Sequence, residues 1–369
     1  MSDGNLHAYL GCSKSEQWLA CTPSVRLEQA FPDERSSFAA EGKEAHALGE
    51  ACLRADTDAS AMKEHYPQEM IDAVQVYLDY VRAIEHEHMH VEVRVDVSRW
   101  VPEGFGTSDA VLIAGKTLHV LDYKHGKGVF VDVTDNTQGM LYGLGAFNEY
   151  DSVYGPFERV VIHIVQPRMG NVASWEIAVD DLLAWGTDIR PIAEAAFKGE
   201  GKAMAGDHCG FCRARFTCRA RADYVIDTYD GATSDPEIMD DTEIATLYPK
   251  LDAMIKWAND VKEHALTRVQ KGQRLPGLKL VEGRSNRTYA DEDMVAGTLL
   301  ASGYETKNIY TMKLLGITAM ETVVGKKRLT QLLDGLIIKP AGKPVLVSLE
   351  DPRSEINTQD AALAELLRN

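Results

Sequence analysis

The sequence has no long apolar run, and this argues against a membrane-spanning protein. Hydrophobic residues make up 45% of the chain, but no stretch of them approaches the roughly 20 residues that a transmembrane helix needs. The N-terminal residues lack the pattern of a signal peptide. Internal repeats and low-complexity tracts are missing as well. We therefore expect a cytoplasmic globular protein with no membrane partner, and its 369 residues suggest two or three domains.

Positive charge is also scarce. The chain holds 39 Lys and Arg against 56 Asp and Glu, which gives a formal net charge of -17. This excess of acid argues against a broad surface that coats DNA without specificity. It leaves room for a protein that binds nucleic acid in a narrow channel, or that receives it from a partner.

Cysteines are few, and their spacing is informative. The six are Cys12, Cys21, Cys52, Cys209, Cys212 and Cys218. In a cytoplasmic protein such a set favours metal or redox chemistry over disulfides. The last three follow a C-x2-C-x5-C spacing, which can hold one metal. A fourth ligand is missing nearby, because the adjacent His208 is geometrically awkward. Cys21 is the better candidate, although Cys12 is close enough in sequence to compete with it.

A strand-rich stretch carries the candidate catalytic groups. Alternating valines over 91–97 predict a half-buried strand, and two further β-rich runs separated only by 114–116 predict a hairpin. Asp122 and Lys124 are two residues apart on one strand, so both side chains project from the same face. Asp109 on the neighbouring strand can reach that face. We therefore expect two carboxylates and one amine to converge.

Clustered carboxylates repel one another unless a cation lies between them. Their hard oxygen atoms favour Mg²⁺ or Mn²⁺ over zinc. A lysine amine beside them can orient a water molecule, or offset the charge that develops during phosphoryl transfer. The Asp-x-Lys pattern alone is weak evidence, because it is also common on solvated strand faces.

The order of the surrounding motifs is more specific than any one of them. Gly106-x-x-Asp109, Asp122-x-Lys124 and Gln138-x-x-x-Tyr142 follow one another along the chain. The i,i+4 spacing places Gln138 and Tyr142 on one face of a helix predicted over 137–149. This series resembles the RecB-like branch of the PD-(D/E)XK nuclease superfamily, in which a helical histidine precedes it. His46, in a helix predicted over 36–55, takes that place.

The resemblance implies a fold and an activity. The fold would be α/β, with a restriction-endonuclease-like core in which helices flank a mixed central sheet. The activity would be that of a metal-dependent DNA exonuclease. The implied ligands of Mg²⁺ or Mn²⁺ are His46, Asp109, Asp122 and the carbonyl of Tyr123. Lys124 would position the attacking water, and Gln138 and Tyr142 would hold the DNA strand or the geometry of the motif. Glu92 resembles an acidic residue that assists this metal site or binds a basic neighbour.

The cysteines fit the same resemblance. Several RecB-like nucleases hold a [4Fe-4S] cluster with one N-terminal and three C-terminal cysteines, which here implies Cys21, Cys209, Cys212 and Cys218. The cluster would staple the two ends of the nuclease domain together. A structural Zn²⁺ on the same cysteines is the alternative.

Several basic residues lie near these motifs. Lys127 could touch phosphate, and Arg213, Arg215 and Arg219 could line a path for the DNA backbone. These arginines could equally hydrogen-bond the sulfur atoms or pair with the surplus acids of the chain.

The remaining pattern predicts the domain organisation. We expect a nuclease domain over 1–225, an acidic, turn-rich linker over 226–242, and a mainly helical accessory domain of unknown role over 243–369. Other expected elements are a helix over 68–88, a solvated His-rich connection at 85–90, a strand over 158–167, a helix over 176–199 interrupted at Pro191, and a short β element over 277–289.

The whole chain is similar to a phage- and prophage-borne family of RecB-like nuclease proteins that carried a domain-of-unknown-function label. This resemblance implies end resection of DNA during phage recombination or replication. The alternative is a non-catalytic scaffold on the nuclease fold. Its accessory domain would dock a phage single-strand-binding protein, recombination protein or polymerase. Either form could be an oligomer.

Overall fold

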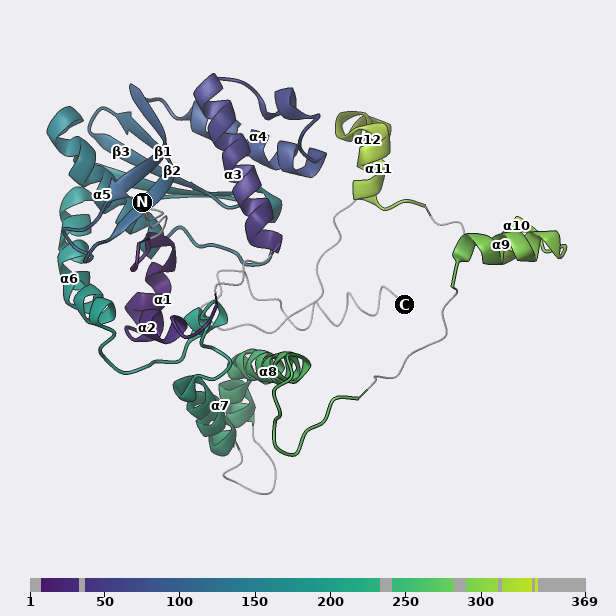
Figure 1. The fold of residues 1–369 in the computed structure, drawn as a ribbon. Coiled ribbons are helices and arrows are strands. Elements are labelled where there is room, and N and C mark those ends of the chain that lie inside the picture. Colours follow the sequence, from purple (N-terminus) through teal and green to yellow (C-terminus); the bar gives the residue numbers. More distant parts are fainter. Residues whose placement is uncertain are drawn as a thin grey trace, which may run out of the picture. The chain divides into compact units, whose positions relative to one another are not determined.

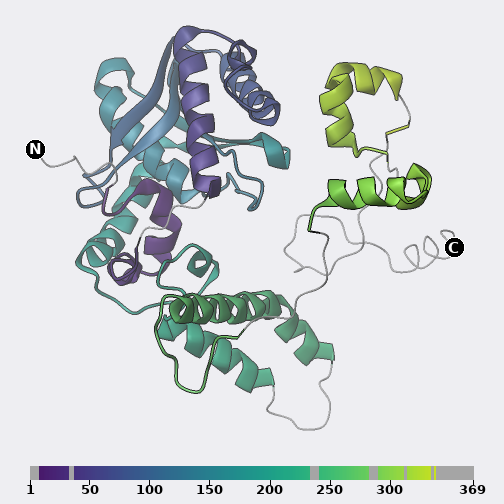
Figure 2. The same cartoon turned by 45° about the vertical axis from the view of Figure 1, so that its right-hand side comes forward.

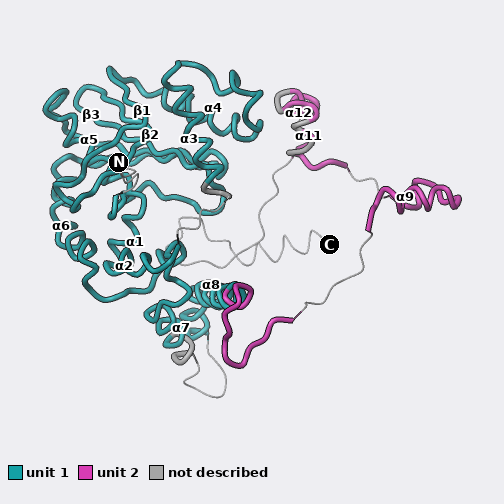
Figure 3. Tube along the Cα trace, viewed as in Figure 1, with its two compact units in different colours: residues 1–267 teal, residues 268–369 magenta. Residues whose placement is uncertain are grey.

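The computed structural model describes residues 8–32, 37–232, 241–281, 290–310, 314–333 and 336–337. By compactness the chain divides into two units, residues 1–267 and 268–369 (Figure 3). The first unit holds the sheet and every candidate site residue, and the two units are described separately below.

A mixed β-sheet forms the centre of the first unit. Its strands are β1 (His88–Asp96), β2 (Phe105–Ala114), β3 (Thr117–Tyr123), β4 (Arg159–Gln166) and β5 (Asn171–Ala178). In the described residues they form one five-stranded sheet in the order β1-β2-β3-β4-β5. The predicted hairpin is confirmed, since β2 and β3 pair antiparallel. β3 and β4 are parallel, and parallel neighbours need a long crossover. The predicted α/β class and mixed sheet are therefore confirmed.

Helices cover both faces of this sheet (Figure 1, Figure 2). On one face lie α3 (Ser37–Ala55) and α4 (Gln68–Ala83), and on the other α5 (Thr137–Tyr154) and α6 (Val179–Lys198). The other helices of the first unit are α1 (Ser15–Ala20), α2 (Ser24–Glu28), α7 (Arg219–Ala232) and α8 (Asp241–Gln270). Short 3-10 turns lie at Cys12–Lys14, Ala59–Met62, Pro167–Met169 and Asp207–Gly210. Successive side chains of β2 point to opposite faces of the sheet. Val111 and Ile113 pack in the core beneath α5 and α6. Ala110 and Leu112 pack in the core beneath α3 and α4.

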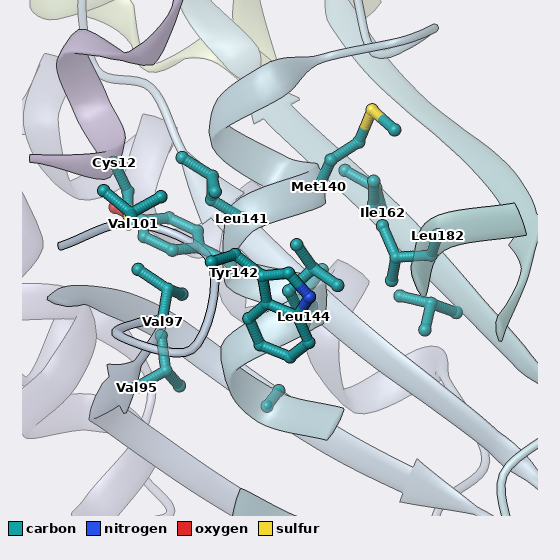
Figure 4. Close-up of a cluster of buried hydrophobic side chains, with 14 of the residues drawn as sticks. Cys12, Val95, Val97, Val101, Met140, Leu141, Tyr142, Leu144, Ile162 and Leu182 are labelled. Carbon is teal, nitrogen blue, oxygen red and sulfur yellow. The ribbon is translucent and has the colours of Figure 1, made fainter. Parts of the chain in front are cut away.

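The two cores follow from the sequence pattern. The apolar stripe of α4, which includes Val74, Tyr77, Leu78 and Val81, is buried. Burial of each such side chain stabilises the fold by about 1.5–3 kcal/mol. On the opposite face, α5 carries Tyr142 into the core of hydrophobic side chains shown in Figure 4. The helix that bears the Gln-x-x-x-Tyr motif is thus fixed against the sheet.

Some predicted element boundaries were wrong. α4 ends at Ala83 and β1 begins at His88, so part of the His-rich segment 85–90 is a strand rather than a connection. The segment 176–199 begins in β5, and α6 continues through Pro191 without a break. The buried residues Ile189 and Ala193 flank that proline and hold the helix against the core. A proline removes one helical hydrogen bond, which this packing tolerates.

The end of the first unit differs in detail from the expected linker. α7 continues to Ala232, so residues 226–232 are helical, while 233–240 lie outside the described residues. α8 packs against the preceding segment through an ion pair between Arg221 and Asp260 at 2.6 Å. The compact unit accordingly includes most of α8 and ends at Thr267.

The second unit is helical where it is described. Its helices are α9 (Glu292–Ala301), α10 (Thr306–Ile309), α11 (Ile317–Val324) and α12 (Lys326–Leu332). Residues 277–281 of the predicted β element form no strand, and 282–289 lie outside the described residues. Among the described helices of the chain, none is both long and apolar enough to cross a membrane.

Candidate functional site

Three potential metal ligands meet on one face of the sheet, near the middle of β1 and β2. His46 of α3, Glu92 of β1 and Asp109 of β2 each offer one ligand atom, and these atoms all lie within 4.8 Å of one another. His46 Nδ1 lies 2.7 Å from Asp109 Oδ1. The second carboxylate oxygen, Asp109 Oδ2, accepts a hydrogen bond of 2.6 Å from the backbone N–H of Tyr123. The carboxylate is therefore oriented by both neighbours, as metal ligands usually are.

Glu92 owes its place in this group to an irregular backbone. Its φ is 50°, a left-handed conformation that is uncommon outside glycine and concentrates at functional sites. The strand changes faces there: Val91 packs in the core beneath α3 and α4, whereas Val93 packs in the core beneath α5. The expectation of a regularly alternating strand over 91–97 was therefore wrong. The irregularity turns the Glu92 carboxylate toward Asp109.

A second group adjoins the first and contains the predicted lysine. Lys124 Nζ lies 2.8 Å from Asp122 Oδ2 and donates to Gln138 Oε1 at 2.9 Å. Gln138 Nε2 donates to Asp122 Oδ1 at 3.2 Å and to the Tyr142 hydroxyl at 2.9 Å. The structure thus brings together all four residues of the Asp-x-Lys and Gln-x-x-x-Tyr motifs. The amide of Gln138 bridges the strand and the helix.

The pKa shifts reveal a surplus of negative charge in a poorly solvated place. Burial, with the charge of Asp109, raises the pKa of Glu92 to about 7. Burial also raises the pKa of Asp122, although Lys124 opposes the shift. Burial lowers the pKa of Lys124, but the charge of Asp122 outweighs it and the net shift is upward. The lysine is therefore an ammonium ion at neutral pH, and one more cation would relieve the carboxylates.

The donor set fits a hard divalent cation. Two carboxylates and an imidazole suit Mn²⁺, and are compatible with Mg²⁺. The buried hydroxyl of Tyr77 adds a further sign. It has no hydrogen-bond partner among the described residues, and burial and the charges of Asp109, Glu92 and Asp122 raise its pKa well above the ordinary value. A buried hydroxyl without a hydrogen-bond partner, next to acidic groups, indicates that an ion or a water molecule binds beside Tyr77.

Three of the four candidate phosphate-binding residues have ion-pair partners within the described part of the chain: Lys127, Arg213 and Arg215. Lys127 Nζ lies 3.2 Å from Glu69. The backbone N–H of Arg213 donates to Glu28 at 2.8 Å. The Arg215 guanidinium lies 4.1 Å from the centre of the Phe216 ring, and Arg219 is exposed. The interpretation of Arg213 and Arg215 as structural residues gains support from these contacts.

The cysteines approach one another from the two ends of the first unit. His208 hydrogen-bonds the sulfur atoms of Cys209 and Cys21, and these contacts raise the pKa of His208 to about 10. Burial raises the pKa of Cys212 to about 11, and nearby Cys218 adds to the shift. In the part of the chain that is described, no three cysteine sulfurs lie within 4.8 Å of one another. Among the described residues, His208 thus lies next to Cys209 and Cys21, and the cysteines do not form a compact cluster.

The sequence did not predict a network of charged side chains that surrounds Arg168, next to the segment after Lys124. The Arg168 side chain contacts Glu41 and Glu69, at 2.9 Å in each case. Glu41 lies 3.3 Å from His125 Nε2, and His125 Nδ1 lies 2.8 Å from the Tyr123 hydroxyl. The network ties α3 and α4 to the segment that follows Lys124. No local motif marks it, because its members are spread over more than a hundred residues.

Two comparisons with known proteins bear on this chain. A family model described as "Protein of unknown function (DUF2800)" matches residues 7–354. The solved structure titled "Crystal structure of SSO0001" is 17% identical, and the match covers 60% of this chain and 89% of that chain, with a TM-score of 0.29. A TM-score of this size supports no argument about fold or activity.

Proposed function

The chain belongs to the DUF2800 family, whose description assigns no activity, and we propose from the site that the protein is a Mg²⁺- or Mn²⁺-dependent deoxyribonuclease. The proposal includes a restriction-endonuclease-like core of the RecB-like PD-(D/E)XK type. One observation carries it: the His46, Glu92 and Asp109 group adjoins the Asp122–Lys124 pair. Within that pair, Lys124 Nζ lies 2.8 Å from Asp122 Oδ2. Exonucleolytic resection of DNA ends in phage recombination or replication rests on the resemblance alone.

Each residue has a role in this proposal. His46, Glu92 and Asp109 would hold the divalent ion, and Asp122 is the next carboxylate available to it. When bound, such an ion stabilises charge on a phosphate and lowers the pKa of water. Lys124 is protonated and cannot be the general base. It orients the attacking water or offsets charge on the phosphate.

Gln138 and Tyr142 position that lysine. The amide of Gln138 accepts from Lys124 and donates to Asp122 and Tyr142, so its orientation is fixed from three sides. The buried ring of Tyr142 sits in the core beneath α5. The ammonium group is therefore held in place before substrate arrives, as electrostatic catalysis requires.

We further propose a structural [4Fe-4S] cluster on Cys21, Cys209, Cys212 and Cys218, with Zn²⁺ as the alternative. Three of these four cysteines are buried, and Cys21 meets Cys209 around His208. Phosphodiester hydrolysis moves no electrons, so the cluster's role would be to hold the two ends of the domain together.

Digestion of end-labelled linear DNA tests the proposed activity. Protein purified without oxygen is incubated with Mn²⁺, and Asp122→Asn and Lys124→Ala are compared with Asp72→Ala, which removes an exposed carboxylate of α4. We expect the first two variants to lose at least about 100-fold in rate, and the control to cut like the wild type. Full activity in both site variants would contradict the proposal. A folded, metal-loaded wild type that cuts nothing would favour the scaffold.

A further inference from the structure

The loop over residues 125–136 begins and ends in the candidate site. It leaves from Lys124 at the end of β3 and returns at α5, where Asn136 caps the helix by accepting from the N–H of Gly139. The hydrogen bond of 2.9 Å between Lys124 Nζ and Gln138 Oε1 closes the base of the loop. The residues that hold the site together therefore also fix where this loop emerges.

Two buried side chains fix the middle of the loop as well. Gln166, which is 2% exposed, donates to the carbonyls of Gly126 at 3.1 Å and Val129 at 2.7 Å. Val131 is held on both sides: its N–H donates to Gln166 Oε1 at 3.3 Å, and its carbonyl accepts from Asn171 Nδ2 at 2.8 Å. The backbone is thus anchored on either side of residue 130.

This anchored backbone holds two apolar side chains in solvent. Val129 is 55% exposed and Phe130 is 60% exposed, whereas Val133 further along the loop is buried. Burial of a phenylalanine ring stabilises a fold, and the exposed Phe130 ring does not contribute this stabilisation in full. The ring is therefore exposed on a fixed loop whose two ends lie at the candidate catalytic site, and a ligand bound there can reach it.

From this geometry we infer that Phe130 stacks on an unpaired nucleobase of a single-stranded DNA end whose backbone enters the Asp122–Lys124 site. The inference rests on the proposed nuclease function. A phenyl ring carries no hydrogen-bonding atoms, so it reads no base edge, but every base offers a π-face to it. The site would then accept single-stranded ends of any sequence. Two exposed side chains are too small a patch for a stable protein–protein interface.

Binding without cleavage tests this inference. A single-stranded oligonucleotide with 2-aminopurine near its end is titrated in EDTA, and fluorescence quenching and anisotropy report stacking and affinity. We expect Phe130→Ala to lose the quenching and to weaken binding about tenfold, since stacking on one base is worth roughly 1–3 kcal/mol. Phe130→Tyr keeps the ring and should retain both signals. Tyr248→Ala removes a 45% exposed aromatic side chain elsewhere and should change neither.

Two results would overturn the inference. One is unchanged affinity and quenching in Phe130→Ala. The other is full affinity and quenching in Phe130→Leu, because an apolar side chain without a ring would then suffice. Cleavage in Mn²⁺ is measured separately. If the wild type cleaves DNA and Phe130→Ala binds it unchanged, the proposed nuclease function is retained and the stacking role of Phe130 is rejected. If binding depends on the ring but the wild type cleaves nothing, the stacking role is retained and the nuclease function is rejected.

Discussion

At the scale of single residues, Glu92 is the site residue whose expected role differs most from its position in the structure. Its carboxylate lies with His46 and Asp109, and burial beside Asp109 raises its pKa to about 7. The resemblance assigns the metal to His46, Asp109, Asp122 and the Tyr123 carbonyl. In the structure Glu92 lies in one group with His46 and Asp109, and Asp122 lies 2.8 Å from Lys124.

Glu92→Gln should therefore weaken Mn²⁺ binding. The amide keeps the shape of the side chain and removes the charge that attracts the ion, so we expect a loss of affinity larger than the 10–100-fold that outer-sphere changes typically cause. Isothermal titration with Mn²⁺ measures it. Asp72→Asn, on α4, removes the charge of an exposed carboxylate and should leave the affinity unchanged. Equal affinity in Glu92→Gln and the wild type would exclude Glu92 as a ligand.

At the scale of elements, the closeness of α5 to the sheet places Gln138 beside Lys124. Gly139 makes this approach possible: a Cβ atom at this position would lie 2.3 Å from Ile162 Cγ2 of β4. A contact of that length forces the helix or the strand to move. A glycine inside a helix costs about 1 kcal/mol relative to alanine, so the fold accepts this cost in exchange for close packing.

Gly139→Ala and Gly42→Ala should change stability in opposite directions. Gly42 lies in α3, where a Cβ atom would meet nothing within 4 Å, so alanine should stabilise the protein by about 0.5–1 kcal/mol. At Gly139 the overpacking cost of about 1–3 kcal/mol outweighs the helix propensity, and the shift of α5 should also slow cleavage. Urea unfolding followed by circular dichroism measures both. Stabilisation by both substitutions would mean that α5 has room to move.

At the scale of the whole molecule, the N-terminal segment is attached to the segment that carries the last three cysteines. The Glu28 carboxylate, which is 1% exposed, accepts from Lys14 at 2.6 Å and from the N–H of Arg213 at 2.8 Å. Thr22 donates to the carbonyl of Glu200 at 2.6 Å. These contacts span most of the first unit in sequence, and the proposed cluster would reinforce the same junction.

The substitution Cys212→Ser tests whether Cys212 binds a metal cluster or only packs in the core. We expect protein purified without oxygen to lose its iron and its brown colour, and its melting temperature to fall by several degrees, because metal-site binding energy is also folding energy. Cys52→Ser changes a buried cysteine of α3 and should keep the metal. Metal analysis and thermal unfolding measure the effects. Zinc in place of iron would support the alternative, and a metal-free wild type would contradict both.

Much of the fold follows from local periodicity. The two β-rich runs separated by 114–116 and the apolar stripe of α4 come from residues near one another in the chain, and they predicted the hairpin and the helix correctly. The same periods placed Asp122 with Lys124 and Gln138 with Tyr142. These pairs meet in the structure because a strand or a helix fixes the direction of its own side chains.

The sequence by itself therefore determined the hairpin of the central sheet, the position of most helices of the first unit and the pairs within each motif. Only the tertiary structure decided which pairs face one another. Three features have no local signature in the sequence. They are the left-handed backbone at Glu92, the Arg168 network and the hydrogen bonds from Gln166 to the loop after Lys124. Each depends on the register and packing of elements distant in the chain, and such contacts are set by the burial of the whole core rather than by neighbours in sequence.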